Sequence, residues 1–207
     1  VTRVYDKVAA HPAFRFFGNV AAGRDITADE FLRHYHAVVW AGGAEADRTL
    51  DIPGEALAGS HTATEFVAWY NGHPDFQDRR FDLDQEAAAV VGVGNVAMDV
   101  TRILASDPDD LAKTDIAAHA LEALRASRVR TIHLLGRRGP AQAAFTNPEL
   151  KELGELPLAD VVVRAEDLEL DAATKASLEA TPDREAEKNL KTLRAFQERG
   201  VLGRPRR

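Results

Sequence analysis

Apolar residues along this chain fall into two patterns, short continuous runs and stretches with helical spacing. The continuous run at 87–91 predicts a strand that is buried on both faces, and the stretches at 129–135 and 160–164 predict two further strands of the same sheet. Apolar residues that recur every three or four positions predict helices at 95–107, 115–126, 145–156 and 171–199. Strands that alternate with helices indicate an α/β fold, in which helices cover a mainly parallel sheet.

The residues before this region carry a weaker pattern. Short apolar runs at 14–20 and 37–40 predict two short strands. One or two helical turns are predicted at 29–34, and a further helix at 64–69. These elements are too short to define a fold by themselves.

The stretch VVGVGNVAMDVTRIL, residues 90–104, combines a strand end, two glycines and a helix start. Gly92 and Gly94 permit a tight turn and a close approach of the backbone to a ligand. A helix that begins near Asn95 offers unpaired N–H groups and a partial positive charge, which suit a pyrophosphate. Ala97 completes the pattern G-x-G-x-x-A, so we expect a Rossmann-like, three-layer NAD(P)-binding fold. The alternative is an ordinary tight turn in an α/β sheet.

The end of the next predicted strand indicates which dinucleotide is bound. An NAD site usually has Asp or Glu there, which accepts a hydrogen bond from the ribose 2′-hydroxyl. This chain has Arg137 and Arg138 instead, and guanidinium groups match the 2′-phosphate of NADP. A solvated basic turn is the alternative. The pair disfavours a generic NAD-dependent oxidoreductase.

Composition excludes several other classes. The chain is 45% hydrophobic and 29% charged, as in an ordinary globular protein, and its net charge of −7 argues against a general nucleic-acid binder. No apolar run approaches the ~20 residues of a membrane span. The chain has no cysteine, and therefore no thiolate nucleophile and no disulfide. We expect a cytoplasmic location.

Other candidate chemistry is sparse. His34 and His36 could form half of a metal site, but no third ligand is evident, and a surface pair is favoured. Asp99 and Arg102 are three residues apart on one predicted helix, where an ion pair on the helix surface is expected. We therefore predict neither a metal site nor a catalytic side chain.

Several stretches together resemble the adrenodoxin-reductase type of ferredoxin–NADP reductase. They include GVGNVAMDVTRIL, KTDI and GRRGPAQAAFTNPELKEL, and before them FRFFGNVAAGRDIT, HYHAVVWAGGAEADRTLDIPGE and EFVAWYNGHP. They occur in the order and at the spacing of that family and span nearly the whole chain. The resemblance implies a flavoenzyme that transfers electrons between NADPH and ferredoxin through FAD.

The resemblance also implies roles for individual residues. Asn95 and Val96 correspond to residues that contact the NADP pyrophosphate. Arg137 and Arg138 correspond to residues that hold the 2′-phosphate. Glu149 corresponds to a carboxylate beside the adenosine end of the cofactor, although a Glu in the first turn of a helix is favourable in any case.

The resemblance divides the chain into two parts. Residues 1–44 correspond to the tail of the first FAD-domain segment, and residues 45–207 to most of the NADP-binding domain. Gly43 matches a glycine on a strand that returns toward the flavin, whereas Gly42 replaces a larger residue, which puts a local FAD contact in doubt.

The glycine-rich FAD loop of the family and its closing C-terminal segment have no counterpart in this sequence. We therefore expect an internal fragment, with no reductase activity by itself, because a hydride donor and a one-electron acceptor need a flavin between them. A stand-alone, non-catalytic NADP-binding module is the alternative hypothesis.

Overall fold

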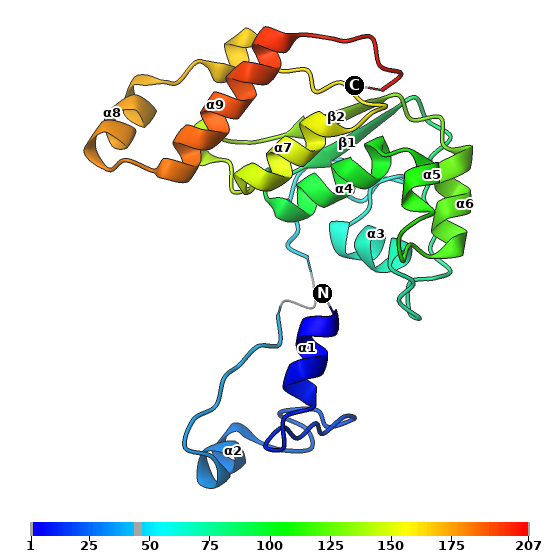
Figure 1. Cartoon of the computed structure of the whole chain (residues 1–207), viewed down its shortest axis with the longest axis vertical. Helices are drawn as coiled ribbons and strands as arrows, with labels where there is room; N and C mark the ends of the chain where they lie inside the picture. Colours follow the sequence, from blue (N-terminus) through cyan, green and yellow to red (C-terminus); the bar gives the residue numbers. More distant parts are fainter. Residues whose placement is uncertain (1, 44–46, 207) are drawn as a thin grey trace. The chain divides into compact units, whose positions relative to one another are not determined.

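The chain forms two compact units, Val1–Glu45 and Ala46–Arg207. A computed structural model describes residues 2–43 and 47–206 (Figure 1). Each unit is described by itself.

Within residues 2–43, the first unit has two short helices, α1 (Thr2–Ala9) and α2 (Ala28–His34). Thr27 and Glu30 form a capping box at the start of α2, which confirms the helix predicted at 29–34. The strands predicted at 14–20 and 37–40 are wrong, because both stretches are irregular. A strand needs a neighbour to complete its hydrogen bonds, and apolar residues alone do not supply one.

The second unit follows the predicted alternation of helices and strands. Its helices are α3 (Ala63–Tyr70), α4 (Asn95–Ala105), α5 (Pro108–Leu111), α6 (Ala118–Ala126), η1 (Pro140–Gln142), α7 (Asn147–Glu155), η2 (Ala165–Leu168), α8 (Ala172–Ala180) and α9 (Arg184–Arg199). Its strands are β1 (Ala87–Val91) and β2 (Thr131–Leu135). The two strands confirm the runs at 87–91 and 129–135. The helices predicted at 64–69, 95–107, 115–126 and 145–156 are present within a few residues, whereas the stretch 171–199 forms two helices, α8 and α9.

The strands β1 and β2 pair in parallel, with Ala87 opposite Thr131 and Val91 opposite Leu135. Val90 and its neighbours on one face pack against the helices, whereas Val91 and Leu135 on the other face remain exposed. An α/β class with a parallel sheet is therefore confirmed. Within residues 47–206 the described sheet has two strands, and residues of α3, α4 and α6 pack against the face that carries Val90.

Two clusters of buried side chains meet at α4. The first joins α3, α4 and α6 to β1, and its buried members include Phe66, Trp69, Val90, Ile103 and Leu124. The second joins α4, α7 and α9, with Met98, Phe145, Leu150, Leu153 and Phe196. Because α4 supplies side chains to both clusters, its position is determined from two sides.

The strand predicted at 160–164 is wrong, although the side chains there alternate as in a strand. Val161 and Val163 pack into the second cluster, while Val162 is exposed. In the part of the chain that the structure describes, residues 160–164 belong to no strand, and the ladder contact beside them is an isolated parallel bridge between Ala159 and Arg206. The hydrophobic pattern therefore determines burial, but a strand also requires a hydrogen-bonding partner along its length.

Arg206 connects the last described residues to α4. Its buried guanidinium donates to the carbonyl oxygens of Leu104 and Ser106 at the C-terminal end of that helix. Burial is the main cause that lowers the pKa of Arg206 from its usual value. A cation at this end of a helix interacts favourably with the helix dipole.

The contact between α7 and α9 yields a test of the second cluster. A methyl group at Gly154 would overlap the ring of Phe196, which is buried. Gly→Ala within a helix usually stabilises by about 0.5–1 kcal/mol. We expect Gly154→Ala to lower the free energy of unfolding instead, by about 1–3 kcal/mol, because the core becomes overpacked.

Denaturant unfolding measures this change. The additional substitution Phe196→Leu should make the Gly154→Ala change less costly, since it removes ring atoms from the point of overlap. A more stable Gly154→Ala protein would contradict the described packing.

Candidate functional site

The candidate site begins where β1 ends. Gly92 has a φ of 141°, in the region that favours glycine, and its N–H donates to the carbonyl of Leu135 over 2.9 Å. A Cβ at Gly92 would lie 3.6 Å from the Cβ of Ala97. The backbone turn therefore requires Gly92, and the small Ala97 lets the helix start pack closely on the loop.

Gly94 has a different environment. Its φ of −111° is accessible to any residue, and a Cβ built on it would have no described atom within 4 Å beyond Gly94 and its two chain neighbours. Nothing within the described residues therefore requires a glycine there. The space beside Gly94 suits a group from outside the chain that comes close to the backbone.

The N-terminal end of α4 offers unpaired donors in that space. Gly94 provides no side-chain cap, and the first intrahelical bond runs from the N–H of Met98 to its carbonyl. The N–H groups of Asn95, Val96 and Ala97 precede that bond and have no intrahelical acceptor. The Val96 side chain is exposed at this end. The arrangement can hold an anion through backbone donors and the helix dipole.

The arginine turn lies next to the glycine loop because the two parallel strands end at the same edge of the sheet. A Cβ at Gly136 would lie 2.9 Å from Cγ1 of Val93, so the two loops touch. Arg137 and Arg138 follow directly and are exposed. Among residues 2–43 and 47–206 neither guanidinium forms an ion pair, which leaves both charges available to a phosphate.

A third segment fastens the glycine loop. The N–H of Ala144 donates to the carbonyl of Val93 over 2.7 Å, and the N–H of Thr146 donates to Oδ1 of Asn95 over 2.9 Å. The Asn95 side chain is thus oriented, with its amide nitrogen left for other contacts. Thr146 was not among the predicted site residues. The sequence TNPE could have indicated this residue, because Thr146 stands there as the N-cap of a helix that has Pro148 in its first turn.

Glu149 lies close to the same point. Its Oε2 accepts a hydrogen bond of 2.6 Å from the hydroxyl of Thr146, the residue that holds Asn95. The structure therefore brings Asn95, Thr146 and Glu149 together at the start of α7. This contact also agrees with the plain structural role of a carboxylate in the first turn of a helix.

The remaining candidates form no second site. Asp99 and Arg102 make the expected helix-surface ion pair, at 2.8 Å. No three His, Asp or Glu side chains gather as metal ligands within residues 2–43 and 47–206. None of the described helices is both long and apolar enough to cross a bilayer.

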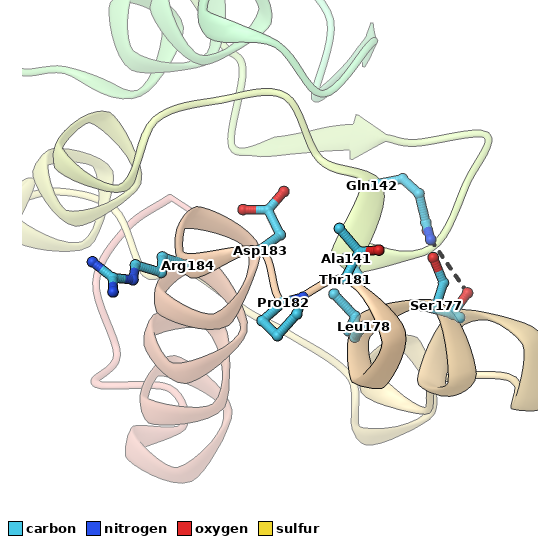
Figure 2. Close-up of a pocket in the computed structure, with 9 residues that line it drawn as sticks. Ala141, Gln142, Ser177, Leu178, Thr181, Pro182, Asp183 and Arg184 are labelled. Carbon is cyan, nitrogen blue, oxygen red and sulfur yellow. Dashed lines mark hydrogen bonds between the residues drawn. The ribbon is translucent and has the colours of Figure 1, made fainter.

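A shallow hollow of about 460 Å³ lies beyond the arginine turn, between η1, α8 and the start of α9. In Figure 2 the amide of Gln142 reaches toward α8, where it donates to the hydroxyl of Thr174 over 3.2 Å. The Arg184 side chain lies at the opposite end of the view, away from Gln142. The lining is polar and open, so the hollow lacks the enclosed apolar wall of a typical ligand pocket.

A glycine loop beside a basic turn at the carboxyl edge of parallel strands is typical of α/β proteins that bind phosphorylated nucleotides. No protein-family model matches the chain. Several curated proteins, however, are similar to the chain. The NADPH-ferredoxin reductase FprA of Mycobacterium tuberculosis is 47% identical over 199 residues, which are 96% of this chain and 43% of that protein.

Two further relatives have related names. A probable ferredoxin/ferredoxin–NADP reductase of Mycobacterium bovis is 54% identical over 79% of this chain and 28% of its own length. The mitochondrial NADPH:adrenodoxin oxidoreductase of Arabidopsis thaliana is 44% identical over 86% of this chain and 37% of its own length. The resemblance found in the sequence is therefore confirmed: the chain is homologous to ferredoxin–NADP reductases that include the adrenodoxin-reductase type.

A solved structure agrees with this relationship. Mycobacterium tuberculosis FprA in complex with NADPH matches 99% of this chain and 45% of its own, with a TM-score of 0.84 and 46% identity. The chain thus spans less than half the length of the relatives that it matches.

The two glycines of the loop should respond differently to substitution. We expect Gly92→Ala to lower the free energy of unfolding by about 1–3 kcal/mol, because its φ of 141° is strained for alanine. Gly94→Ala should change it by no more than about 0.5 kcal/mol, since the added methyl meets no protein atom. Denaturant unfolding of both variants measures the contrast, and equal losses would contradict the loop geometry.

Proposed function

We propose that this chain is the NADP(H)-binding part of a flavin-dependent ferredoxin–NADP reductase. The observation that carries the proposal is the contact between the glycine loop and the arginine turn at one edge of the parallel sheet. The names of the relatives support the same activity. They also favour a reductase over a stand-alone binding module.

In this proposal the pyrophosphate of NADP(H) lies at Gly92–Ala97. The backbone donors of Asn95, Val96 and Ala97 hold it, and Gly94 leaves room for it. Arg137 and Arg138 bind the 2′-phosphate. Glu149, fixed by the hydroxyl of Thr146, lies beside the adenosine end.

The proposal also assigns the two parts of the chain. Residues 45–207 are an NADP-binding domain of Rossmann-like, three-layer type, and residues 1–44 are the tail of a flavin-domain segment. Bound FAD supplies the step that converts a hydride into single electrons. Ferredoxin is the proposed electron partner, and the cytoplasm the proposed location.

The cofactor assignment is tested through the arginine pair. We expect the double substitution Arg137→Ala and Arg138→Ala to weaken NADPH binding by about 3–6 kcal/mol, at about 1.5–3 kcal/mol for each charged hydrogen bond lost. NADH has no 2′-phosphate, so its affinity should change far less. Isothermal calorimetry with both nucleotides measures the difference.

The exposed residues Lys151 and Lys175 provide the matched control. Replacing both with Ala removes the same net charge at positions outside the arginine turn, and should leave the preference for NADPH unchanged. Equal losses for NADPH and NADH in the arginine variant would refute the assignment of the 2′-phosphate.

The activity is tested in a polypeptide that joins these residues to flavin-binding segments. Such a protein should reduce ferredoxin with NADPH, and removing both arginines should lower kcat/KM for NADPH at least about 100-fold. The 207-residue chain assayed by itself should turn over no NADPH, with or without added FAD. Yellow colour and NADPH turnover in the isolated chain would contradict the proposal that these 207 residues by themselves do not hold a functional flavin.

A further inference from the structure

The segment 144–147 lies between the glycine loop and α9. On one side, Ala144 and Thr146 donate hydrogen bonds to Val93 and Asn95. A parallel bridge between Gly94 and Ala144 adds to these contacts. The segment therefore contacts three consecutive residues of the loop, Val93, Gly94 and Asn95.

On its other side, the segment is held by polar side chains of α9. Oε1 of Glu185 accepts the N–H of Asn147 over 2.8 Å. Nδ2 of Asn189 donates to the carbonyl of Phe145 over 3.0 Å, and its Oδ1 accepts from Nδ2 of Asn147 over 3.1 Å. The same nitrogen of Asn147 also donates to the hydroxyl of Thr192, over 2.9 Å.

Packing alone does not explain these polar residues. Asn189 is only 1% exposed, so this polar side chain is at least as buried as the apolar side chains of Leu190 and Phe196 on the same helix. A buried amide is costly unless it is hydrogen-bonded, and each partner of Asn189 belongs to residues 145–147. The amide therefore specifies where that segment lies, which a leucine would not do.

The Glu185 carboxylate shows the same connection electrostatically. The hydrogen bond from the N–H of Asn147 is the largest cause that holds the pKa of Glu185 below its usual value, with Lys188 contributing next. Glu185 is thus ionised at neutral pH, and it accepts one of the N–H groups that the start of α7 cannot satisfy within its own helix.

We infer that Glu185 and Asn189 are positioning residues for the nucleotide site: they fix residues 145–147, which in turn fix the glycine loop and the Asn95 side chain. The inference rests on the proposed function for its nucleotide, but the connection from α9 to the loop can be measured without one.

Hydrogen exchange of the nucleotide-free, 207-residue chain measures that connection. The reporters are the amides of Met98, Ala144 and Thr146. Each of them donates its hydrogen bond to a residue of the glycine loop or the start of α4. In Glu185→Ala we expect them to exchange about tenfold faster, as follows from the loss of one hydrogen bond to a charged group. The amides of Ala117 and Arg130, hydrogen-bonded to Tyr70 and Glu86 elsewhere in the unit, should keep their rates.

Two variants of α9 serve as controls. Glu185→Gln keeps an oxygen acceptor for the Asn147 N–H and should restore slow exchange at the loop. Glu187→Ala removes the same charge from the same turn of α9, where the side chain is exposed, and should have no effect. Asn189→Ala should act on the same reporters as Glu185→Ala.

Nucleotide affinity provides an independent arm. NADPH and NADH binding to Glu185→Ala should weaken by a common factor of about ten, because the arginine turn is untouched. The inference is overturned if Glu185→Ala and Glu185→Gln behave alike at the loop, or if the Ala117 and Arg130 amides accelerate equally. A wild-type chain that binds neither nucleotide would refute the proposed function instead, and the exchange rates would still decide the role of α9.

Discussion

The candidate site depends on the parallel pairing of β1 with β2. In a parallel pair both carboxyl ends lie at the same edge, so the loop after Val91 and the turn after Leu135 emerge together. The bond from Gly92 to the Leu135 carbonyl continues the pairing by one position, into the loop itself. An antiparallel pair of the same strands would place the arginines at the far end of the sheet from the glycines.

The rest of the second unit holds this edge in place. Helix α4 contributes Ile103 to one buried cluster and Met98 to the other, so the helix cannot shift without disturbing both. Residues 144–146 fasten the loop from the side, and α9 fastens those residues in turn. The loop is thus supported by segments that come about 50 and 90 positions later in the chain.

The sequence predicts the parts of this arrangement that are encoded locally. The glycine loop, the helix from Asn95 and the strand at 87–91 follow from spacing and composition within a few residues. The contact of Thr146 with Asn95 is not encoded in that way, because it joins residues that are distant in the chain. The wrong strands at 14–20, 37–40 and 160–164 have the same origin: their apolar patterns are local, whereas a strand requires a partner from elsewhere.

Three glycines near the site show that the residue type alone does not reveal why a glycine is needed at a given position. Gly92 serves the backbone, since its φ is positive. Gly136 serves loop contact, because Val93 occupies the space of a side chain. Gly94 has an ordinary φ and open space around it, so neither its backbone nor the packing of the described residues requires a glycine there. In the proposed function the pyrophosphate comes close to the backbone in this open space, so of the three glycines Gly94 is the one whose role depends on the proposed ligand.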